Sequence, residues 1–253
     1  MSIIFPKKNL GQHFLHDEKI AKKIVQKLSL KSYSSIVELG PGMGLLTQYL
    51  NDKYNDIFVI EKDTEYIKYL HSVFPLLKSR IINMDFIQNN PILSSFALIG
   101  NFPFNISSNI LFFLLKNRNA IPDCIGMFQE QLAERITSSN GGRNYGIFSV
   151  LLQAFYDIEY IFTVPNNFFS PPPRIKSSVI RLHRKTGSVQ KVNESILFKI
   201  VKVSFNQRRK KLRNTLKPLN FSESFYKIPI LEQRAEQLSV QQFIQLSCQT
   251  GIN

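Results

Sequence analysis

The sequence predicts an α/β fold with a mostly parallel sheet, followed by a small all-α domain. Between about residues 17 and 184, short apolar runs of strand length alternate with stretches whose apolar residues recur at helical spacing. Such alternation implies parallel strands joined by helices that cover both faces of the sheet. After the polar segment at 186–188 the helical spacing continues without further strand-like runs. We therefore expect two domains, at residues 1–186 and 187–253.

The expected elements begin with a helix after Asp17, whose carboxylate can accept hydrogen bonds from the first free backbone N–H groups. Runs of strand length follow at residues 35–39, 57–60, 81–84, 96–99, 124–128, 159–164 and 178–182. Helical stretches lie between most of them, at residues 45–50, 64–74, 107–116, 129–137 and 148–156. Only a loop separates the last two strands, which predicts an antiparallel strand at one edge of the sheet. Two further helices are expected at residues 194–217 and 232–250.

The composition argues against a membrane protein, a disulfide scaffold and a metalloprotein. No apolar run approaches the roughly 18 residues of a membrane span, and the first residues lack the apolar core of a signal peptide. Two cysteines, Cys124 and Cys248, are too few for a disulfide framework or a metal cluster. The four histidines are scattered, and none has ligand-like spacing with a cysteine. We expect a cytoplasmic protein that binds no metal.

The charge of the chain favours a polyanionic partner. Thirty-two Lys and Arg against 18 Asp and Glu give a net charge of +14, which suits nucleic acid or an anionic membrane surface. Coding bias toward Lys and Asn can produce part of this excess, so the position of the charge is the better guide. Residues 205–217 contain six basic side chains and no acid. On a helix they would form a phosphate-binding face, with Leu212 and Leu216 turned to the core and with Lys7, Lys8, Lys22 and Lys23 extending the basic path.

A glycine-rich turn follows the first predicted strand and predicts a ligand site. Residues 40–44 read Gly-Pro-Gly-Met-Gly, which departs from the G-x-G-x-x-G fingerprint of dinucleotide sites. Pro41 removes an N–H group that a pyrophosphate would need, so the turn favours a nucleoside without phosphates. Glu61 ends the next strand about 20 residues further on, where an acidic residue binds the ribose hydroxyl groups. Asp85 ends the third strand and can accept from an adenine amine, and the three strand ends together indicate a site for S-adenosylmethionine.

A second short motif predicts the acceptor of the methyl group. Residues 100–104 read Gly-Asn-Phe-Pro-Phe directly after the apolar run at 96–99. Asn and Pro are common in ordinary turns, but beside a methyl donor this turn can hold a flat ring with an exocyclic amine. The side-chain carbonyl of Asn101 and the backbone carbonyl of Phe102 can accept from that amine. Pro103 fixes the turn, and Phe104 offers a stacking face.

Six motifs in order make the chain resemble the ribosomal RNA adenine dimethyltransferases of the KsgA/Dim group. They lie at residues 8–15, 38–44, 59–63, 100–106, 164–173 and 205–214. The resemblance implies a Rossmann-like class I S-adenosylmethionine-dependent methyltransferase fold with a small C-terminal all-α RNA-binding domain. It implies dimethylation of the N6 amines of two adjacent adenosines near the 3′ end of the small-subunit (16S) ribosomal RNA. A role in small-subunit biogenesis, and the small-subunit precursor as partner of a monomeric enzyme, follow from the same resemblance.

The expected site residues form three groups, and the resemblance assigns the first of them, the donor site. The donor site is expected to consist of His13, Leu15, Gly40, Glu61, Asp85 and Asn101. The acceptor site is expected to consist of Asn101, Phe102, Pro103, Phe104 and Phe169, the last closing the second face of a flipped adenine. The RNA-binding residues are expected to be Arg208, Arg209, Lys210, Lys211 and Arg213. Two positions depart from the commoner family residues, since many relatives have Asn in place of His13 and Tyr in place of Phe104.

Three other functions fit parts of the same sequence. A methyltransferase of the antibiotic-resistance type would act on large-subunit RNA, but the motif at 205–214 and the three prolines at 171–173 favour the small-subunit branch. A non-catalytic assembly factor would not need Gly40, Glu61, Asp85 and Asn101 intact. A small-molecule or DNA adenine methyltransferase agrees with the donor and acceptor motifs alone.

Overall fold

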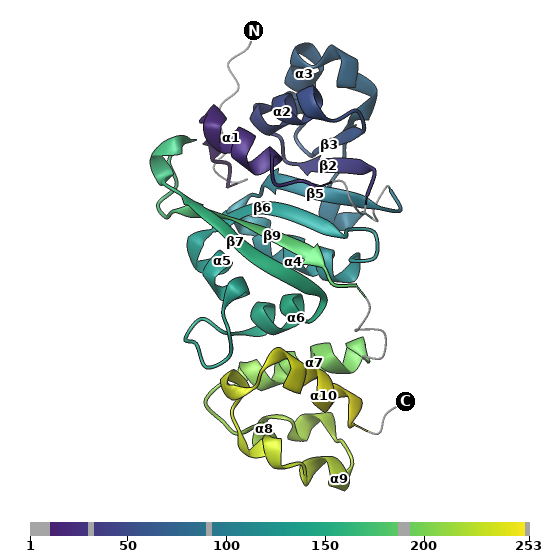
Figure 1. Ribbon diagram of the computed structural model, residues 1–253, viewed down its shortest axis with the longest axis vertical. Helices are drawn as coiled ribbons and strands as arrows, with labels where there is room; N and C mark the ends of the chain where they lie inside the picture. The colour runs from purple at the N-terminus through teal and green to yellow at the C-terminus, as the bar shows by residue number, and fades with distance from the viewer. Residues whose placement is uncertain (1–10, 30–32, 90–92, 187–192, 251–253) are drawn as a thin grey trace. The chain divides into compact units, whose positions relative to one another are not determined.

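The protein is described here by a computed structural model that covers residues 11–29, 33–89, 93–186 and 193–250. A seven-stranded sheet in the order β4-β3-β2-β5-β6-β9-β7 forms its largest element (Figure 1). The strands of this sheet are β2 (Ser35–Leu39), β3 (Ile57–Glu61), β4 (Ile81–Asn83), β5 (Phe96–Asn101), β6 (Asp123–Gln129), β7 (Tyr156–Val164) and β9 (Ser177–Arg184). From β4 to β6 all neighbouring strands are parallel, and β9 is antiparallel to β6. The predicted α/β class and the antiparallel strand near one edge are confirmed.

The strand order reverses direction beside β2. The chain builds outward from β2 to β3 and β4, then returns to β5 on the other side of β2 and continues to β6. Because connections between parallel strands are right-handed, the helices α2 (Leu45–Lys53) and α3 (Thr64–Val73) cover one face, and α4 (Ser107–Lys116) covers the other. The crevice beyond the carboxyl ends of β2 and β5 is therefore a topological switch point, where open α/β sheets bind their ligands.

The sequence explains where these helices begin and why the strands are buried. Asp17 caps α1 (Glu18–Val25) by accepting from the backbone N–H of Ile20 at 2.8 Å. Asp63 caps α3 in the same way through the N–H of Glu65. All five residues of β2 are buried, as expected for a parallel strand covered on both faces.

A small two-stranded sheet that the sequence did not predict pairs distant parts of the chain. Its strands β1 (Phe14–Leu15) and β8 (Phe169–Ser170) are antiparallel, with Leu15 opposite Phe169. Strands of two residues carry no measurable periodicity, so only the tertiary structure reveals them. The pairing places residues 11–15 beside the proline-rich segment at 171–173.

The chain divides into two compact units, and each unit consists of two separate stretches of the sequence. One unit takes residues 1–133 and 159–184, and the other takes 134–158 and 185–253. The helix α6 (Ile147–Phe155) belongs to the second unit, where it packs against α7 (Glu194–Asn206) and α10 (Val240–Cys248). Six of its nine residues are buried, so it needs packing partners on more than one side. The division into functional domains at residues 1–186 and 187–253 stays a prediction.

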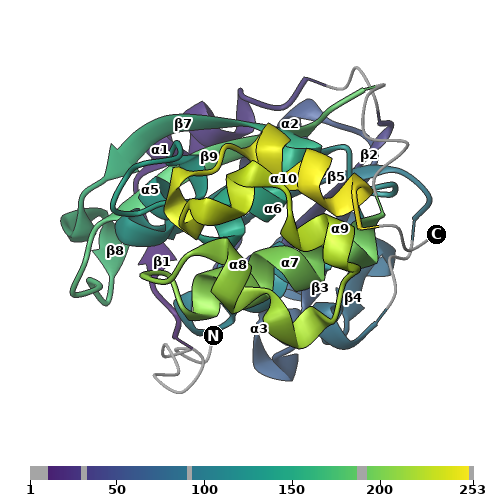
Figure 2. The ribbon, with the colours of Figure 1, turned by 90° about the horizontal axis from the view of Figure 1, so that it is seen from below.

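The helical prediction for residues 194–217 and 232–250 was too long in both cases. The first helix, α7, ends at Asn206, and the chain turns through residues 207–211 before the short α8 (Leu212–Thr215). The backbone of this turn is held by the Leu212 N–H, which donates to the Gln233 carbonyl at 2.8 Å. The second helix is only α10, preceded by short 3-10 turns, and α9 (Glu223–Tyr226) lies before them (Figure 2). Leu212 and Leu216 are buried, as predicted.

Candidate active site

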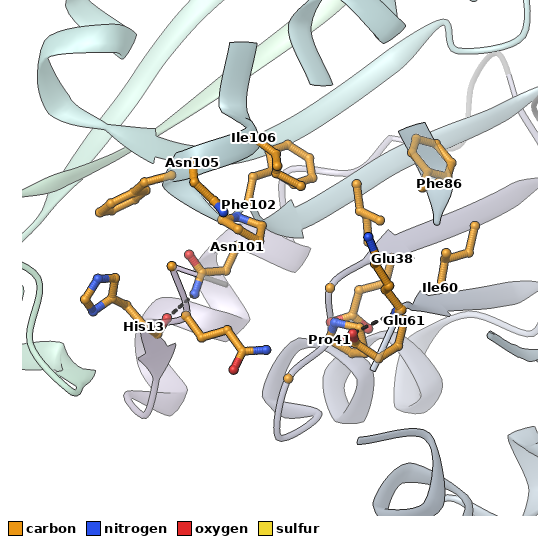
Figure 3. A pocket seen from close by; sticks show the side chains of 18 of the residues that line it. His13, Glu38, Pro41, Ile60, Glu61, Phe86, Asn101, Phe102, Asn105 and Ile106 are labelled. Carbon is orange, nitrogen blue, oxygen red and sulfur yellow. Dashed lines mark hydrogen bonds between the residues drawn. The ribbon is translucent and has the colours of Figure 1, made fainter. Parts of the chain in front are cut away.

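A cavity of about 440 Å³ lies beyond the carboxyl ends of β2, β3 and β5, at the switch point of the sheet. Its volume is typical of sites that enclose a ligand of nucleoside size. It brings together every predicted donor residue and four of the five predicted acceptor residues, which come from separate segments of the chain. Figure 3 labels four of them, His13, Glu61, Asn101 and Phe102. These residues are His13, Leu15, Gly40, Glu61, Asp85, Asn101, Phe102, Pro103 and Phe104.

The glycine-rich turn needs glycine for two different reasons. Gly40 and Gly42 have φ of +67° and +55°, in the left-handed region that other residues rarely adopt. A Cβ on Gly42 would come within 2.6 Å of the Phe14 ring, whereas a Cβ on Gly40 would meet only Pro103, at 3.9 Å. The turn is therefore packed tightly on one side and leaves its backbone at Gly40 close to the open cavity.

Glu61, the last residue of β3, holds its carboxylate in one position at the cavity wall. Its Oε1 accepts from the backbone N–H groups of Lys62 at 2.8 Å and Asp63 at 2.9 Å. Burial raises the pKa of Glu61, and these backbone hydrogen bonds oppose the shift. The carboxylate is thus oriented by the backbone and needs no other side chain to fix it.

Asp85 lies two residues beyond the end of β4 rather than in the strand. Its Oδ1 accepts from the Ile87 N–H at 3.2 Å, and its Oδ2 pairs with the Lys62 ammonium at 2.8 Å. A ligand amine that bound Asp85 would share this carboxylate with Lys62. Lys62 directly follows Glu61 in the motif at 59–63 but was not among the predicted site residues.

Glu38 lines the cavity as well, although it was not among the predicted site residues. It lies inside the buried strand β2, accepts from the Thr47 hydroxyl at 2.6 Å and is only 1% exposed. Burial raises the pKa of Glu38 to about 8, and the nearby Glu61 carboxylate contributes to the shift. A charged residue type between Val37 and Leu39, within a strand of apolar neighbours, was the available signal.

Asn101 ends β5 with its side-chain amide held in one orientation. The amide nitrogen donates to the backbone carbonyl of His13 at 2.7 Å (Figure 3). The amide oxygen has no hydrogen-bond partner among the described residues, so it is available to accept from a ligand. The turn beyond it is anchored by Phe102, whose buried ring fills the space beside Gly126; a Cβ on Gly126 would lie 2.4 Å from that ring.

His13 connects the β1 segment to the acceptor turn and to the proline-rich segment. Its Nδ1 lies 2.8 Å from the Pro171 carbonyl. Since a carbonyl can only accept, Nδ1 carries the hydrogen of this bond. The His13 ring lies 5.5 Å from the Phe104 ring, at 36° to it, so these two side chains are neighbours at the cavity wall.

Phe169 is the one predicted acceptor residue that is not among the residues lining the cavity. Its side chain is 3% exposed, belongs to the hydrophobic core and does not line the cavity. Strand pairing with Leu15 holds its backbone in β8, and the ring packs inward. That Phe169 closes the second face of a flipped base stays a prediction.

Some of the predicted RNA-binding side chains are already paired within the protein, and others are not. Arg208 donates to the carbonyls of Arg143 and Gly142 and pairs with Glu236, so it holds the loop at 140–144 within its own unit. Lys211 and Arg213 both pair with Glu232, whose pKa they lower. Arg209 and Lys210 are exposed, and neither has an ion pair within the described part of the chain.

The cations near the start of the chain are engaged or lie outside the described residues. Lys22 pairs with Glu18 and Lys23 lies over the Phe162 ring at 4.0 Å. Lys7 and Lys8 precede residue 11, where the description begins.

The described residues offer neither a metal site nor a helix that could span a membrane. No group of three or more His, Cys, Asp or Glu side chains at residues 11–29, 33–89, 93–186 and 193–250 could hold a metal ion. Within the same ranges, no helix has both the length and the apolar character needed to cross a membrane.

Comparison with known proteins gives one family over almost the whole chain. The model of the ribosomal RNA adenine dimethylase family matches residues 6–249. Proteins named ribosomal RNA small subunit methyltransferase A from Cytophaga hutchinsonii and Flavobacterium johnsoniae are each 51% identical to this chain. The matches cover 98% of this chain, and 98% and 96% of the two relatives.

Solved structures show the same fold at lower identity. A dimethyladenosine transferase from Plasmodium falciparum superposes with a TM-score of 0.79 at 23% identity, covering 92% of this chain and 96% of that one. The 23S rRNA methyltransferase ErmE gives a TM-score of 0.70 at 22% identity, covering 93% and 100%. These structures confirm the predicted class I methyltransferase fold. The extent of the family match and the identity of the relatives establish that this chain belongs to the ribosomal RNA adenine dimethylase family.

Proposed function

We propose that this protein transfers methyl groups from S-adenosylmethionine to the N6 amines of two adjacent adenosines near the 3′ end of 16S ribosomal RNA. The observation that carries the proposal is the shared cavity: the Asn101 amide oxygen and the donor residues Gly40, Glu61 and Asp85 line one space. Family membership and the names of the relatives support the same reaction.

The residues of the cavity suit S-adenosylmethionine. Glu61 can accept from the ribose hydroxyl groups, because backbone N–H groups already orient its carboxylate. Asp85 can accept from the adenine amine, and the open backbone at Gly40 allows close approach of the donor. His13 and Leu15 complete the wall of the donor site. When bound, the sulfonium supplies an electrophilic methyl group.

The acceptor residues can make the adenine N6 amine a better nucleophile. The lone pair of adenine N6 is delocalised into the ring, so the amine is a poor nucleophile. Hydrogen bonds from the amine to the Asn101 amide oxygen and the Phe102 carbonyl localise that lone pair and aim it at the donor methyl. Phe104 stacks on the base and Pro103 keeps the turn rigid. No dedicated base is needed, because the methylated ammonium releases its proton to water, and the rate enhancement comes mainly from positioning.

The target adenosines must be unpaired or flipped, because N6 cannot be reached inside a helix. We propose that the small-subunit precursor presents them to a monomeric enzyme in the cytoplasm, during small-subunit biogenesis. Residues 187–253 act as the RNA-binding domain, with Arg209 and Lys210 as the cations free to bind phosphate. Lys211 and Arg213 can add to this surface, since their shared partner Glu232 neutralises only one of them.

Methyl transfer to purified ribosomal subunits tests the choice of substrate. Small and large subunits from cells that lack this protein are incubated with the protein and radiolabelled S-adenosylmethionine, and the labelled positions are mapped by primer extension. The proposal predicts label only in small-subunit RNA, near its 3′ end. Label in large-subunit RNA alone would make the protein an enzyme of the antibiotic-resistance type, and no label in either would favour a non-catalytic assembly factor.

A further inference from the structure

We infer that the second unit carries a separate binding groove for one unpaired nucleotide of RNA, here called the C-terminal groove. It has a volume of about 520 Å³ and is lined by Arg213, Lys217, Asn220, Phe221 and Tyr226. All five residues lie in the second compact unit, and none lines the active-site cavity. The inference rests on the proposed function only in that both take RNA as the partner.

The two aromatic residues of the groove, Phe221 and Tyr226, are held in place by the buried Phe225. Phe221 packs on the buried Phe225 with ring centroids 4.5 Å apart, and Tyr226 meets Phe225 edge-on at 5.5 Å. The Tyr226 hydroxyl donates to the Leu216 carbonyl at 3.0 Å, which fixes the second ring. Phe221 and Tyr226 are themselves only partly buried. Rings that are fixed and accessible offer stacking faces at little entropic cost.

The basic side chains in and beside the groove are only partly neutralised by acidic residues, so they can bind a phosphate. Glu232 pairs with Arg213 at 2.6 Å and with Lys211 at 3.0 Å, so one acid faces two cations. Lys217 is exposed and has no ion pair with any described residue. Asn220 adds an exposed amide, which can donate to and accept from the edge of a base.

The combination favours a nucleotide over other anions. A phosphate alone or a lipid headgroup needs the cations but gains nothing from two positioned rings. An unpaired nucleotide uses all three features, since its phosphate meets Lys217 and Arg213, its base stacks on Phe221 or Tyr226, and its edge meets Asn220. The exposed Arg209 and Lys210 belong to the same unit and add to its positive charge.

The test compares two groove variants of the full-length protein with matched controls. Phe221→Leu keeps the apolar contact with Phe225 and removes the stacking face, and Lys217→Gln removes one charge. The controls are Phe112→Ala, an exposed aromatic residue of α4, and Lys227→Gln, an exposed cation of the second unit outside the groove. The probes are a ten-nucleotide oligouridylate, a duplex RNA of equal length and phosphatidylglycerol vesicles. S-adenosylmethionine binding is measured for every variant as a check that the protein is folded.

The inference predicts that Phe221→Leu weakens oligouridylate binding by about tenfold and leaves duplex binding unchanged, because only unpaired bases stack. Lys217→Gln should weaken oligouridylate binding and reduce the slope of log affinity against log salt by about one. The two controls should bind the oligouridylate as the wild type does. Oligouridylate affinity unchanged in Phe221→Leu, or equal losses for single strand and duplex, would overturn the inference. So would vesicle binding that depends on Lys217 while RNA binding does not.

The proposed function and the groove can fail separately. If the wild type methylates small subunits but the groove variants bind oligouridylate normally, the groove is wrong and the function stands. If the variants behave as predicted but the wild type methylates no subunit, the function is wrong and the groove stands.

Discussion

At the scale of the residue, the amide of Asn101 is the group on which the proposed chemistry depends most. Its nitrogen donates to the His13 carbonyl, so its oxygen is the atom left to accept from an amine. If the amide were rotated, its nitrogen would face the adenine amine. This nitrogen can only donate, so it could not accept the hydrogen bond from N6–H that localises the lone pair. The orientation is fixed by a backbone group from the β1 segment, which explains why residues far apart in the sequence must meet for the site to form.

Asn101→Asp tests this orientation with almost no change in size. The carboxylate cannot donate to the His13 carbonyl and is repelled by it, so we expect kcat to fall by about 100-fold, as misplacement of a positioning group does. Methyl transfer to small subunits gives the rate. The matched control is Asn109→Asp, which changes an exposed residue of the same cavity that has no proposed role in the reaction and should retain nearly full activity. Equal rates for both variants would remove Asn101 from the acceptor site.

Glu61→Gln tests the donor site. The amide keeps the shape of the side chain but loses the charge that favours ribose hydroxyl groups and a sulfonium, so we expect the Kd for S-adenosylmethionine to rise by about tenfold, as for loss of a charged hydrogen bond. Isothermal titration calorimetry measures it. Glu65→Gln, at an exposed position in α3, should bind as the wild type does. Unchanged affinity in Glu61→Gln would show that the donor binds elsewhere.

We expect Glu38 to make the free energy of unfolding depend on pH. Its pKa of about 8 in the folded protein lies above the ordinary value of 4.5, so the folded state binds more protons between these values. Stability should therefore fall as the pH rises from about 5 to 8, by at most about 1.4 kcal/mol per pH unit. Glu38→Gln should flatten this dependence, since its amide oxygen can still accept from Thr47. Urea unfolding at pH 5, 6.5 and 8 measures it, and parallel curves for wild type and variant would contradict the assignment.

At the scale of the element, the ends of the parallel strands supply most of the site. Gly40, Glu61 and Asn101 follow or end three strands of one sheet, so periodicity and position were enough to predict that they meet. Glu38 and Lys62 were missed because one lies inside a strand and the other resembles a solvated lysine. The burial of Phe169 could not be predicted, because the pairing of β1 with β8 depends on residues more than 150 positions apart. Residues 207–211 were expected to be helical because helical spacing does not report a tertiary contact such as that of Leu212 with Gln233.

The glycine-rich turn can be tested as an element with two alanine variants. Gly42→Ala combines a left-handed φ with a clash against Phe14, whereas Gly141→Ala has a left-handed φ of +81° and no atom within 4 Å of the new Cβ. We expect Gly141→Ala to lower the free energy of unfolding by about 1 kcal/mol and Gly42→Ala by about 2–4 kcal/mol. Only Gly42→Ala should weaken donor binding. Denaturant unfolding and calorimetry measure both effects, and equal costs would mean that the turn is not tightly packed.

At the scale of the whole molecule, the net charge of +14 suits an RNA partner. The basic side chains of residues 208–210 differ in whether they are available to bind it. Arg208 is engaged with the loop at 140–144, while Arg209 and Lys210 are exposed. We therefore expect the double variant Arg209→Glu and Lys210→Glu to weaken small-subunit binding at least tenfold at physiological salt and to reduce its salt dependence. Filter binding over a range of salt concentrations measures this. The control is the double variant Lys68→Glu and Lys78→Glu, which reverses the charge of two exposed lysines of the first unit. Wild-type affinity for the small subunit in the Arg209→Glu and Lys210→Glu variant would exclude these two residues from the RNA interface.

The central claim is that one cavity dimethylates N6 of adenosines in small-subunit RNA. Nucleoside analysis by mass spectrometry tests it most directly, after small subunits that lack the modification are incubated with S-adenosylmethionine and the protein. The account predicts two N6,N6-dimethyladenosines per small subunit with the wild type, and a rate about 100-fold lower with Asn101→Asp. Methylation of a different atom or base, or full dimethylation by Asn101→Asp, would contradict it.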